Sequence, residues 1–279
     1  MEFVAFAPRI GHEFPNRAHQ KGRAMKAGFF KKAARKISRR ATGPDQPALP
    51  ANLNRDKLDL IDFIFERCHP APRSIADLGG VWGVDGAYTF YTLGKYQLDS
   101  AFLVDARLNP AVSAKAKKFP QLKLIEGIFG ERRTHEKIAH ADAVFLFDIL
   151  LHQSKPSWDE ILEIYSAKTR IFVIYGQQWI KTERSVRLFD LGREEYFRNV
   201  PHDPTEPPYV GLFENLDVKL PNWDRPHREK LDVWQWGITD NDLIETMRRL
   251  GFKMQYYKNF GPFEPLENFE NHAFVFQKK

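Results

Sequence analysis

Short apolar runs alternate with amphipathic helical patterns through most of the chain. Between the last two central runs, for example, Trp158, Ile161, Leu162 and Tyr165 share one helical face. Alternating strands and helices predict a parallel sheet with helices on both faces and a ligand at the carboxyl ends of the strands. The five predicted central strands are 75–78, 101–104, 122–125, 142–147 and 170–175.

The C-terminal part of the chain continues this pattern with one helix and two further strands. Residues 239–242 (TDND) are typical of a helix start, Leu243 and Met247 lie on its apolar face, and Gly251 is a helix stop. The apolar runs that follow predict a closing antiparallel hairpin. These runs are 253–257 and 272–277.

A glycine-rich loop follows the first predicted strand, in the segment 74–86 (SIADLGGVWGVDG). Asp77 lies at the end of the strand, and Gly79 and Gly83 permit a tight turn that a side chain would obstruct. A strand that turns into a helix around glycines is typical of a nucleotide-like cofactor site.

Two common phosphate-binding patterns do not fit this loop. A dinucleotide loop needs glycines at relative positions one, three and six, but from Gly79 these positions hold Val81 and Val84, and the register from Gly80 fails in the same way. A nucleoside-triphosphate loop needs Gly-Lys-Ser/Thr, and the pair at 94–95 is followed by tyrosine. The sequence therefore does not support pyrophosphate binding.

The loop resembles motif I of the class I S-adenosylmethionine-dependent methyltransferases, acid-x-Gly-x-Gly-x-Gly, with Val81 in place of the middle glycine. The resemblance covers about residues 54–279. It implies an α/β, Rossmann-like methyltransferase fold: a mostly parallel seven-stranded sheet, helices on both faces, a closing antiparallel hairpin and an insertion after the fifth strand. It also implies S-adenosyl-L-methionine as cofactor, with S-adenosyl-L-homocysteine as product.

The same resemblance assigns the cofactor contacts. Asp105 ends the second strand, where family members bind both ribose hydroxyls with an acid, a group that only accepts hydrogen bonds. Residues 126–129 (EGIF) follow the third strand, where family members contact adenine, and 148–153 (DILLHQ) resembles the family's D-x-L-x-H segment. The implied contacts are Asp77, Gly79, Gly80, Gly83, Asp105, Ala106, Gly127, Ile128, Phe129, Phe147 and Asp148.

His152 is the candidate catalytic base, because a neutral imidazole accepts a proton near pH 7. A purely structural role, as a helix cap or pocket wall, is the alternative. Residues 176–236 are rich in proline and aromatic residues and fit no regular period, which predicts a cap over the acceptor site. No acid follows the fifth strand, so no metal site is expected. The candidate acceptor-binding residues are Gln177, Gln178, Trp179, His202 and His227.

The positive charge of the chain is concentrated at its N-terminus. Residues 1–44 carry eleven Lys or Arg and two acids, whereas the whole chain has a net charge of +6, which leaves −3 for the remainder. The segment 21–40 places apolar residues at helical spacing among basic ones. Three interpretations remain open for this segment: a solvated tail, contact with an anionic membrane surface, or contact with nucleic acid.

Composition places the rest of the chain in one globular domain. A chain of 279 residues with 43% hydrophobic side chains can bury a sizeable core, and the single cysteine, Cys68, excludes an internal disulfide. The absence of a long apolar run or signal peptide predicts a cytoplasmic location, with peripheral contact at the inner membrane surface as an option. The expected division is an arm and linker at 1–50 and a methyltransferase domain at 51–279, with its insertion at 176–236.

These observations predict an S-adenosylmethionine-dependent methyltransferase that acts on an oxygen of a small molecule or glycan. Two alternatives remain open: an RNA methyltransferase guided by the basic arm, and a non-catalytic binding protein on the same fold. The sequence leaves the oligomeric state open.

Overall fold

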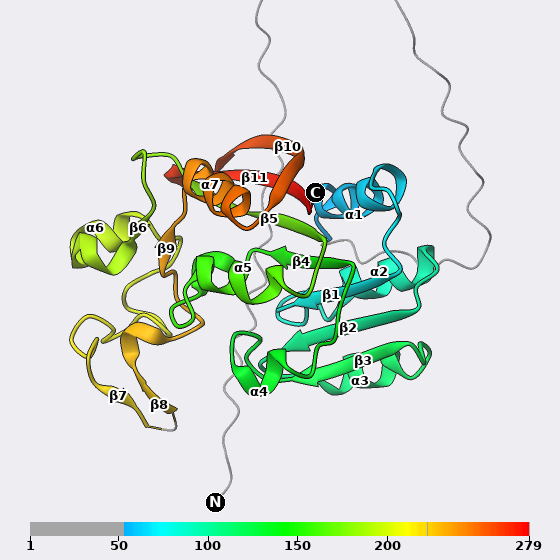
Figure 1. Cartoon of the computed structure of the whole chain (residues 1–279). Helices are drawn as coiled ribbons and strands as arrows, with labels where there is room; N and C mark the ends of the chain where they lie inside the picture. The colour runs from blue at the N-terminus through cyan, green and yellow to red at the C-terminus, as the bar shows by residue number, and fades with distance from the viewer. Residues whose placement is uncertain (1–52, 222, 279) are drawn as a thin grey trace, which may run out of the picture. The chain divides into compact units, whose positions relative to one another are not determined.

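A seven-stranded sheet forms the centre of the protein in the computed structural model, which describes residues 53–221 and 223–278 (Figure 1). The strand order is β10-β11-β5-β4-β1-β2-β3. The central five strands are parallel, and β11 runs antiparallel to both of its neighbours. The basic arm, including segment 21–40, lies outside the described residues. The strands are β1 (Ser74–Leu78), β2 (Ser100–Asp105), β3 (Leu122–Glu126), β4 (Ala143–Phe147), β5 (Ile171–Trp179), β10 (Phe252–Phe263) and β11 (Leu266–Lys278).

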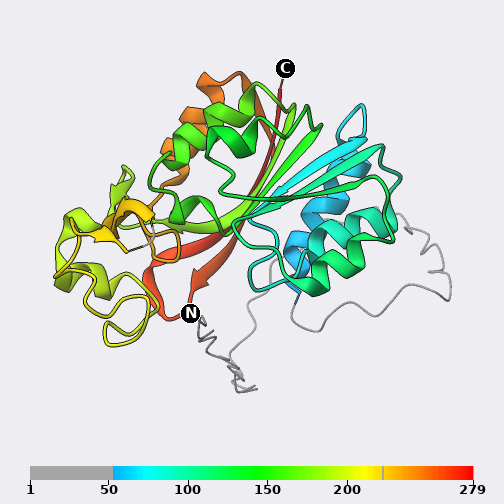
Figure 2. The ribbon, with the colours of Figure 1, turned by 90° about the horizontal axis from the view of Figure 1, so that it is seen from below.

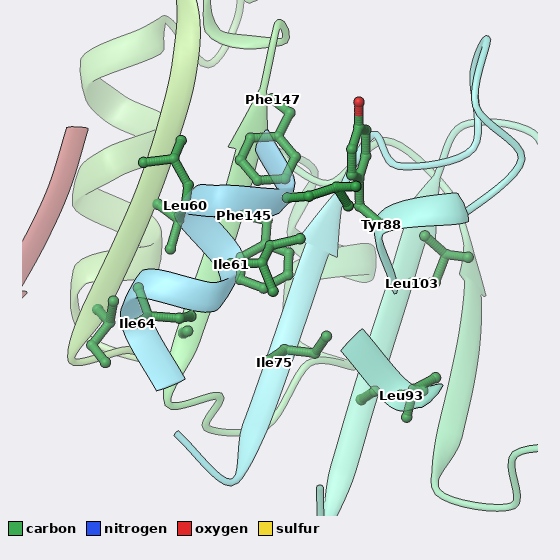
Figure 3. Packing of buried hydrophobic residues seen from close by; sticks show 14 of the residues in the cluster. Leu60, Ile61, Ile64, Ile75, Tyr88, Leu93, Leu103, Phe145 and Phe147 are labelled. Carbon is green, nitrogen blue, oxygen red and sulfur yellow. The ribbon is translucent and has the colours of Figure 1, made fainter. Parts of the chain in front are cut away.

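Helices cover both faces of this sheet, as the sequence predicts (Figure 2). Successive strand residues point to opposite faces, so Ile75 packs under α1 (Arg55–Arg67), α2 (Ala87–Lys95) and α3 (Pro110–Ala116), whereas Ala76 faces α5 (Trp158–Ser166) and α7 (Asp240–Arg249). On the first face, Leu60, Ile61 and Ile64 of α1 pack near Phe145 and Ile75 (Figure 3). The short α4 (Arg132–His135) follows β3.

Local side-chain capping fixes the starts of α1, α3, α5 and α7. Asn109 accepts a hydrogen bond from Val112 N at 2.9 Å, with Pro110 in the first turn of α3, and Thr239 caps α7. α5 begins with a capping box between Ser157 and Glu160. No helix of the described segments is both long enough and apolar enough to cross a membrane.

The closing hairpin is longer than the sequence predicts, and it lengthens β5 as well. β11 pairs with β5 without interruption from Gln277 opposite Ile171 to Phe269 opposite Trp179. β5 therefore continues through residues 176–179, which the sequence analysis assigned to the insertion. The pairing partner lies some ninety residues further along the chain, so local periodicity could not reveal this extension.

The rest of the insertion forms a small layer with its own core. It contains η2 (Leu188–Leu191), α6 (Arg193–Arg198), η3 (His227–Glu229) and two short antiparallel strand pairs, and Tyr196 OH donates to Trp234 O at 2.9 Å. The strands are β6 (Val186–Arg187), β7 (Lys219–Leu220), β8 (Trp223–Pro226) and β9 (Trp236–Gly237). This core also takes in Leu151 and side chains of β5 and β11, and its buried residues are Leu151, Trp179, Leu188, Phe189, Tyr196, Val200, Tyr209, Leu212, Val233, Trp234, Leu266 and Phe269.

Candidate active site

The strand order reverses between β1 and β4, and the polar residues of interest lie at the carboxyl ends of these strands. In open α/β sheets, ligands bind in the crevice outside such a reversal point. Gly79 N donates to Val104 O at 2.7 Å, next to Asp105. A Cβ on Gly79 would lie 2.8 Å from Ile149 Cγ2, just after β4. The loops after β1, β2 and β4 therefore meet.

The glycine loop closes tightly over Asp77. Gly79 and Gly83 have φ of 72° and 74°, values that L side chains rarely adopt. A Cβ on Gly80 would lie 2.4 to 2.7 Å from the Asp77 carboxyl atoms, which leaves no room for it. Around Gly83, in contrast, a Cβ would meet no atom within 4 Å. The loop is therefore tightly packed on its inner side, at Gly80 against Asp77, and has free space on its outer side, at Gly83.

Asp77 is a buried carboxyl whose ionised form is disfavoured. Its side chain accepts a hydrogen bond from Thr89 Oγ1 at 2.7 Å. Burial raises its pKa to about 6, and the charge of Asp105 acts in the same direction, whereas Thr89 and Lys57 act in the opposite direction. Asp77 therefore ionises close to neutral pH.

Asp105 holds the outer part of the loop. Its Oδ2 accepts hydrogen bonds from Val81 N at 2.9 Å and Trp82 N at 3.2 Å, and its Oδ1 accepts one from Arg107 N at 3.2 Å. A carboxylate has about four lone-pair sites, so both oxygens keep capacity for a ligand. Ala106 is exposed, and the indole of Trp82 is 80% exposed. Trp82 is thus not a core residue.

The segment after β3 differs in detail from the sequence-based prediction. Gly127 has a φ of 149°, and a Cβ there would lie 2.4 Å from Thr134 Oγ1. Ile128 is half-buried, but Phe129 is buried in the core beneath Gly79, and its carbonyl accepts a hydrogen bond from Tyr165 OH at 2.7 Å. Phe129 therefore supports the loop from below with its ring in the core, whereas the resemblance implies that it contacts the cofactor.

Asp148, directly after β4, belongs to a polar network that the sequence analysis did not find. It forms an ion pair with Lys57 of α1, and its Oδ1 accepts a hydrogen bond from Gln177 Nε2 at 3.0 Å. Its φ of 57° is unusual for a residue other than glycine. Lys57 shares a helical face with Ile61 and Ile64 at i+4 and i+7, and this spacing was the available signal for its burial.

Three aromatic rings surround the Lys57 ammonium. Lys57 Nζ lies 5.5 Å from the ring centre of Tyr88, 5.8 Å from that of Phe147 and 5.0 Å from that of Tyr175. Asn54 donates to both tyrosine hydroxyls, from its backbone N to Tyr88 at 3.2 Å and from Nδ2 to Tyr175 at 3.1 Å. We call these three rings and the Asp148 carboxylate the aromatic box.

His152 lies in η1 (Leu150–His152), between the sheet and the cap. Its Nδ1 is 2.9 Å from Val233 O, which only accepts hydrogen bonds, so Nδ1 carries the proton and Nε2 has a lone pair. Burial lowers the pKa of His152 below 6.5, against the opposing effects of the Val233 carbonyl and the Asp148 carboxylate. The imidazole is therefore neutral at pH 7, with Nε2 able to accept a proton.

The predicted acceptor-binding residues do not all come together. Gln177 reaches Asp148, but its neighbour Gln178 is buried on the opposite side of β5. Trp179 is buried in the cap core and donates from Nε1 to Thr182 Oγ1 at 2.7 Å, so its assignment as a ligand contact is wrong. His202 is exposed and stacks on Tyr209, and the half-buried His227 lies in η3.

Across residues 53–221 and 223–278, no group of three or more His, Cys, Asp or Glu side chains is arranged to hold a metal ion.

Comparisons with known proteins identify the fold. No family model matches the chain, and no curated protein sequence matches it. The N-terminal domain of EvdMO1, solved with S-adenosylhomocysteine, is 13% identical with a TM-score of 0.52 over 81% of this chain and 82% of that one. The 1,6-didemethyltoxoflavin-N1-methyltransferase of Burkholderia thailandensis, solved with 1,6-didemethyltoxoflavin and S-adenosylhomocysteine, is 13% identical with a TM-score of 0.50 over 80% of this chain and 78% of that one. The chain has the Rossmann-like α/β fold of these two structures.

Proposed function

We propose that this protein is an S-adenosyl-L-methionine-dependent methyltransferase that methylates an oxygen atom of a small molecule or glycan. One observation carries the proposal: Asp105 and the glycine loop lie hydrogen-bonded together at the point where the strand order reverses. The two similar structures support it, because both were solved with the demethylated cofactor bound.

The residues around the loop suit this cofactor. The outer side of the loop at Gly83 is open, so a ligand can approach the backbone closely. The remaining lone pairs of Asp105 would accept hydrogen bonds from the two ribose hydroxyls. Ala106, Gly127 and Ile128 would line the adenine side. Bound there, S-adenosyl-L-methionine supplies an activated methyl group on a sulfonium, and S-adenosyl-L-homocysteine remains after transfer.

The acceptor would lie between this loop and the cap. His152 Nε2 would take the proton of the acceptor hydroxyl, while the Val233 carbonyl keeps the imidazole in the required tautomer. Gln177 is held by Asp148 and Asn271, at 3.0 and 3.2 Å, and would orient the acceptor. Methyl transfer needs in-line positioning more than covalent chemistry, and a cap with its own core suits that task.

Titration calorimetry with S-adenosyl-L-methionine and S-adenosyl-L-homocysteine tests the cofactor assignment. We expect saturable binding of both by the full chain, weakened in Asp105→Asn. Asp99→Asn is the matched control, because Asp99 is an exposed carboxylate paired with Arg73. Absence of binding at millimolar cofactor would contradict the proposal and favour a non-catalytic binding protein.

A screen of hydroxylated small molecules and glycans, read by mass spectrometry as the gain of one methyl group, tests the acceptor class. Methylation of RNA, but of none of these acceptors, would overturn the assignment to small molecules or glycans. For the basic segment 21–40, the solvated tail, the membrane contact and the nucleic-acid contact all stay predictions.

A further inference from the structure

Lys57 is a buried charge to which the chemistry above gives no role. Its side chain is 9% exposed, and its ammonium is paired with Asp148 and enclosed by Tyr88, Phe147 and Tyr175. Three aromatic faces and one carboxylate form a site that attracts cations, above all cations that water hydrates weakly. An ammonium is strongly hydrated, so it is not the cation that such a box holds best.

The box adjoins the proposed cofactor site. Phe147 ends β4, Tyr175 is its partner across the β4–β5 pair, and Tyr88 lies in the first turn of α2, directly after the glycine loop. Phe147 and Tyr88 lie at the same end of their core cluster, with the Tyr88 hydroxyl pointing out of it (Figure 3). The box thus lies where the loops after β1 and β4 meet.

We propose that the aromatic box receives the methylsulfonium of the cofactor, and that Lys57 is a resident cation that withdraws when the cofactor binds. This inference rests on the proposed function. Two like charges a few Å apart repel each other strongly in a partly buried site, so the box holds one cation at a time. Lys57 is in the first turn of α1, and its long side chain can swing out to water.

The inference distinguishes the two forms of the cofactor. S-adenosyl-L-methionine carries the sulfonium and has to displace the ammonium from Asp148. S-adenosyl-L-homocysteine is a neutral thioether, so Lys57 can stay paired with Asp148 while it is bound. Removing the charge of Lys57 should therefore help the first ligand and not the second.

Calorimetry on the full chain, with both ligands and two variants, tests this. Lys57→Met keeps the length of the side chain and removes its charge, and we expect it to bind S-adenosyl-L-methionine about tenfold more tightly, with little change for S-adenosyl-L-homocysteine. Lys57→Arg keeps the charge, and its guanidinium is more weakly hydrated than an ammonium, so this variant should show no gain for S-adenosyl-L-methionine over S-adenosyl-L-homocysteine. An unchanged or reversed ratio in Lys57→Met overturns the inference.

If the wild type binds neither ligand, the proposed function falls, and this inference falls with it; if it binds both and the ratio does not respond to Lys57→Met, only the inference falls. Should Lys57→Met fail to fold, Phe147→Leu replaces it. We then expect a larger loss of affinity for the charged ligand than for the neutral one, and an equal loss for both would overturn the assignment of the box.

Discussion

Asp77→Asn should stabilise the ligand-free protein at neutral pH, although it removes a residue from the centre of the candidate site. The Asp77 carboxyl is 1% exposed, and Thr89 supplies one hydrogen bond to it. An asparagine has nearly the same shape and keeps an oxygen that can accept this bond. The substitution therefore removes the buried charge and little else.

The size of the expected gain in stability follows from the raised pKa of Asp77. Burial raises the pKa of Asp77 from 3.8 in the unfolded chain to about 6 in the folded protein. The folded protein therefore binds this proton more tightly than the unfolded chain does. The resulting stabilisation is complete below pH 3.8 and is lost as the pH rises through about 6. The complete shift is worth about 3 kcal/mol. With these two pKa values, the ionisation of Asp77 lowers the free energy of unfolding by about 1 kcal/mol near pH 4.5 and by about 3 kcal/mol near pH 7.5. The difference in free energy of unfolding between Asp77→Asn and the wild type should therefore be about 2 kcal/mol larger at pH 7.5 than at pH 4.5.

Urea unfolding of the wild type and the variant at both pH values measures this difference, and other titrating groups cancel in the comparison. Asp142→Asn is a control whose effect on the free energy of unfolding should have the opposite sign. Burial acts to raise the pKa of Asp142, but hydrogen bonds from Arg73, Arg170 and Ser74 hold it below its usual value. Its carboxylate stabilises the fold at neutral pH and loses this effect as the pH falls, so Asp142→Asn should destabilise most near pH 7.5.

Two results would refute the reasoning about Asp77. A gain in stability that does not change with pH would show that the ionisation of Asp77 is not its source. A loss of stability at pH 7.5 would show that the ionised carboxylate has partners in the folded protein that outweigh its burial.

Three other substitutions test the site. Asp105→Ala should weaken cofactor binding by about 1.5 to 3 kcal/mol, the range for hydrogen bonds to a charged group, and an unchanged dissociation constant in calorimetry would refute its role. His152→Ala should leave cofactor affinity intact and lower kcat about 100-fold; in the wild type, kcat/KM should fall with a single protonation below pH 6.5, because burial lowers the pKa of His152. Gly80→Ala should lower both the melting temperature and cofactor affinity, because its Cβ would lie within 2.7 Å of Asp77; Gly94→Ala, where a Cβ meets nothing within 4 Å, is the control.

The sequence predicts the parts of this fold whose signal is local. The five central strands and the helix after 239 lie where the apolar periods place them, and the sheet closes with the predicted antiparallel hairpin. The extension of β5 to Trp179 could not be predicted in this way, because its pairing partner Phe269 lies in a distant part of the chain. The same pairing explains why Trp179, although next to two candidate polar residues, is a core side chain.

The candidate site shows the same division between local and distant information. Asp77 is the second-to-last residue of β1 and Asp105 ends β2, so the chain order alone places them at one edge of the sheet. Lys57 lies on a helix outside every motif, and it reaches Asp148 only because α1 packs against the same sheet face as Tyr88 and Phe147. A sequence motif predicts the residues that contact a cofactor. The position of Lys57 beside Asp148 is set by packing between distant segments, so it could be found only in the structure.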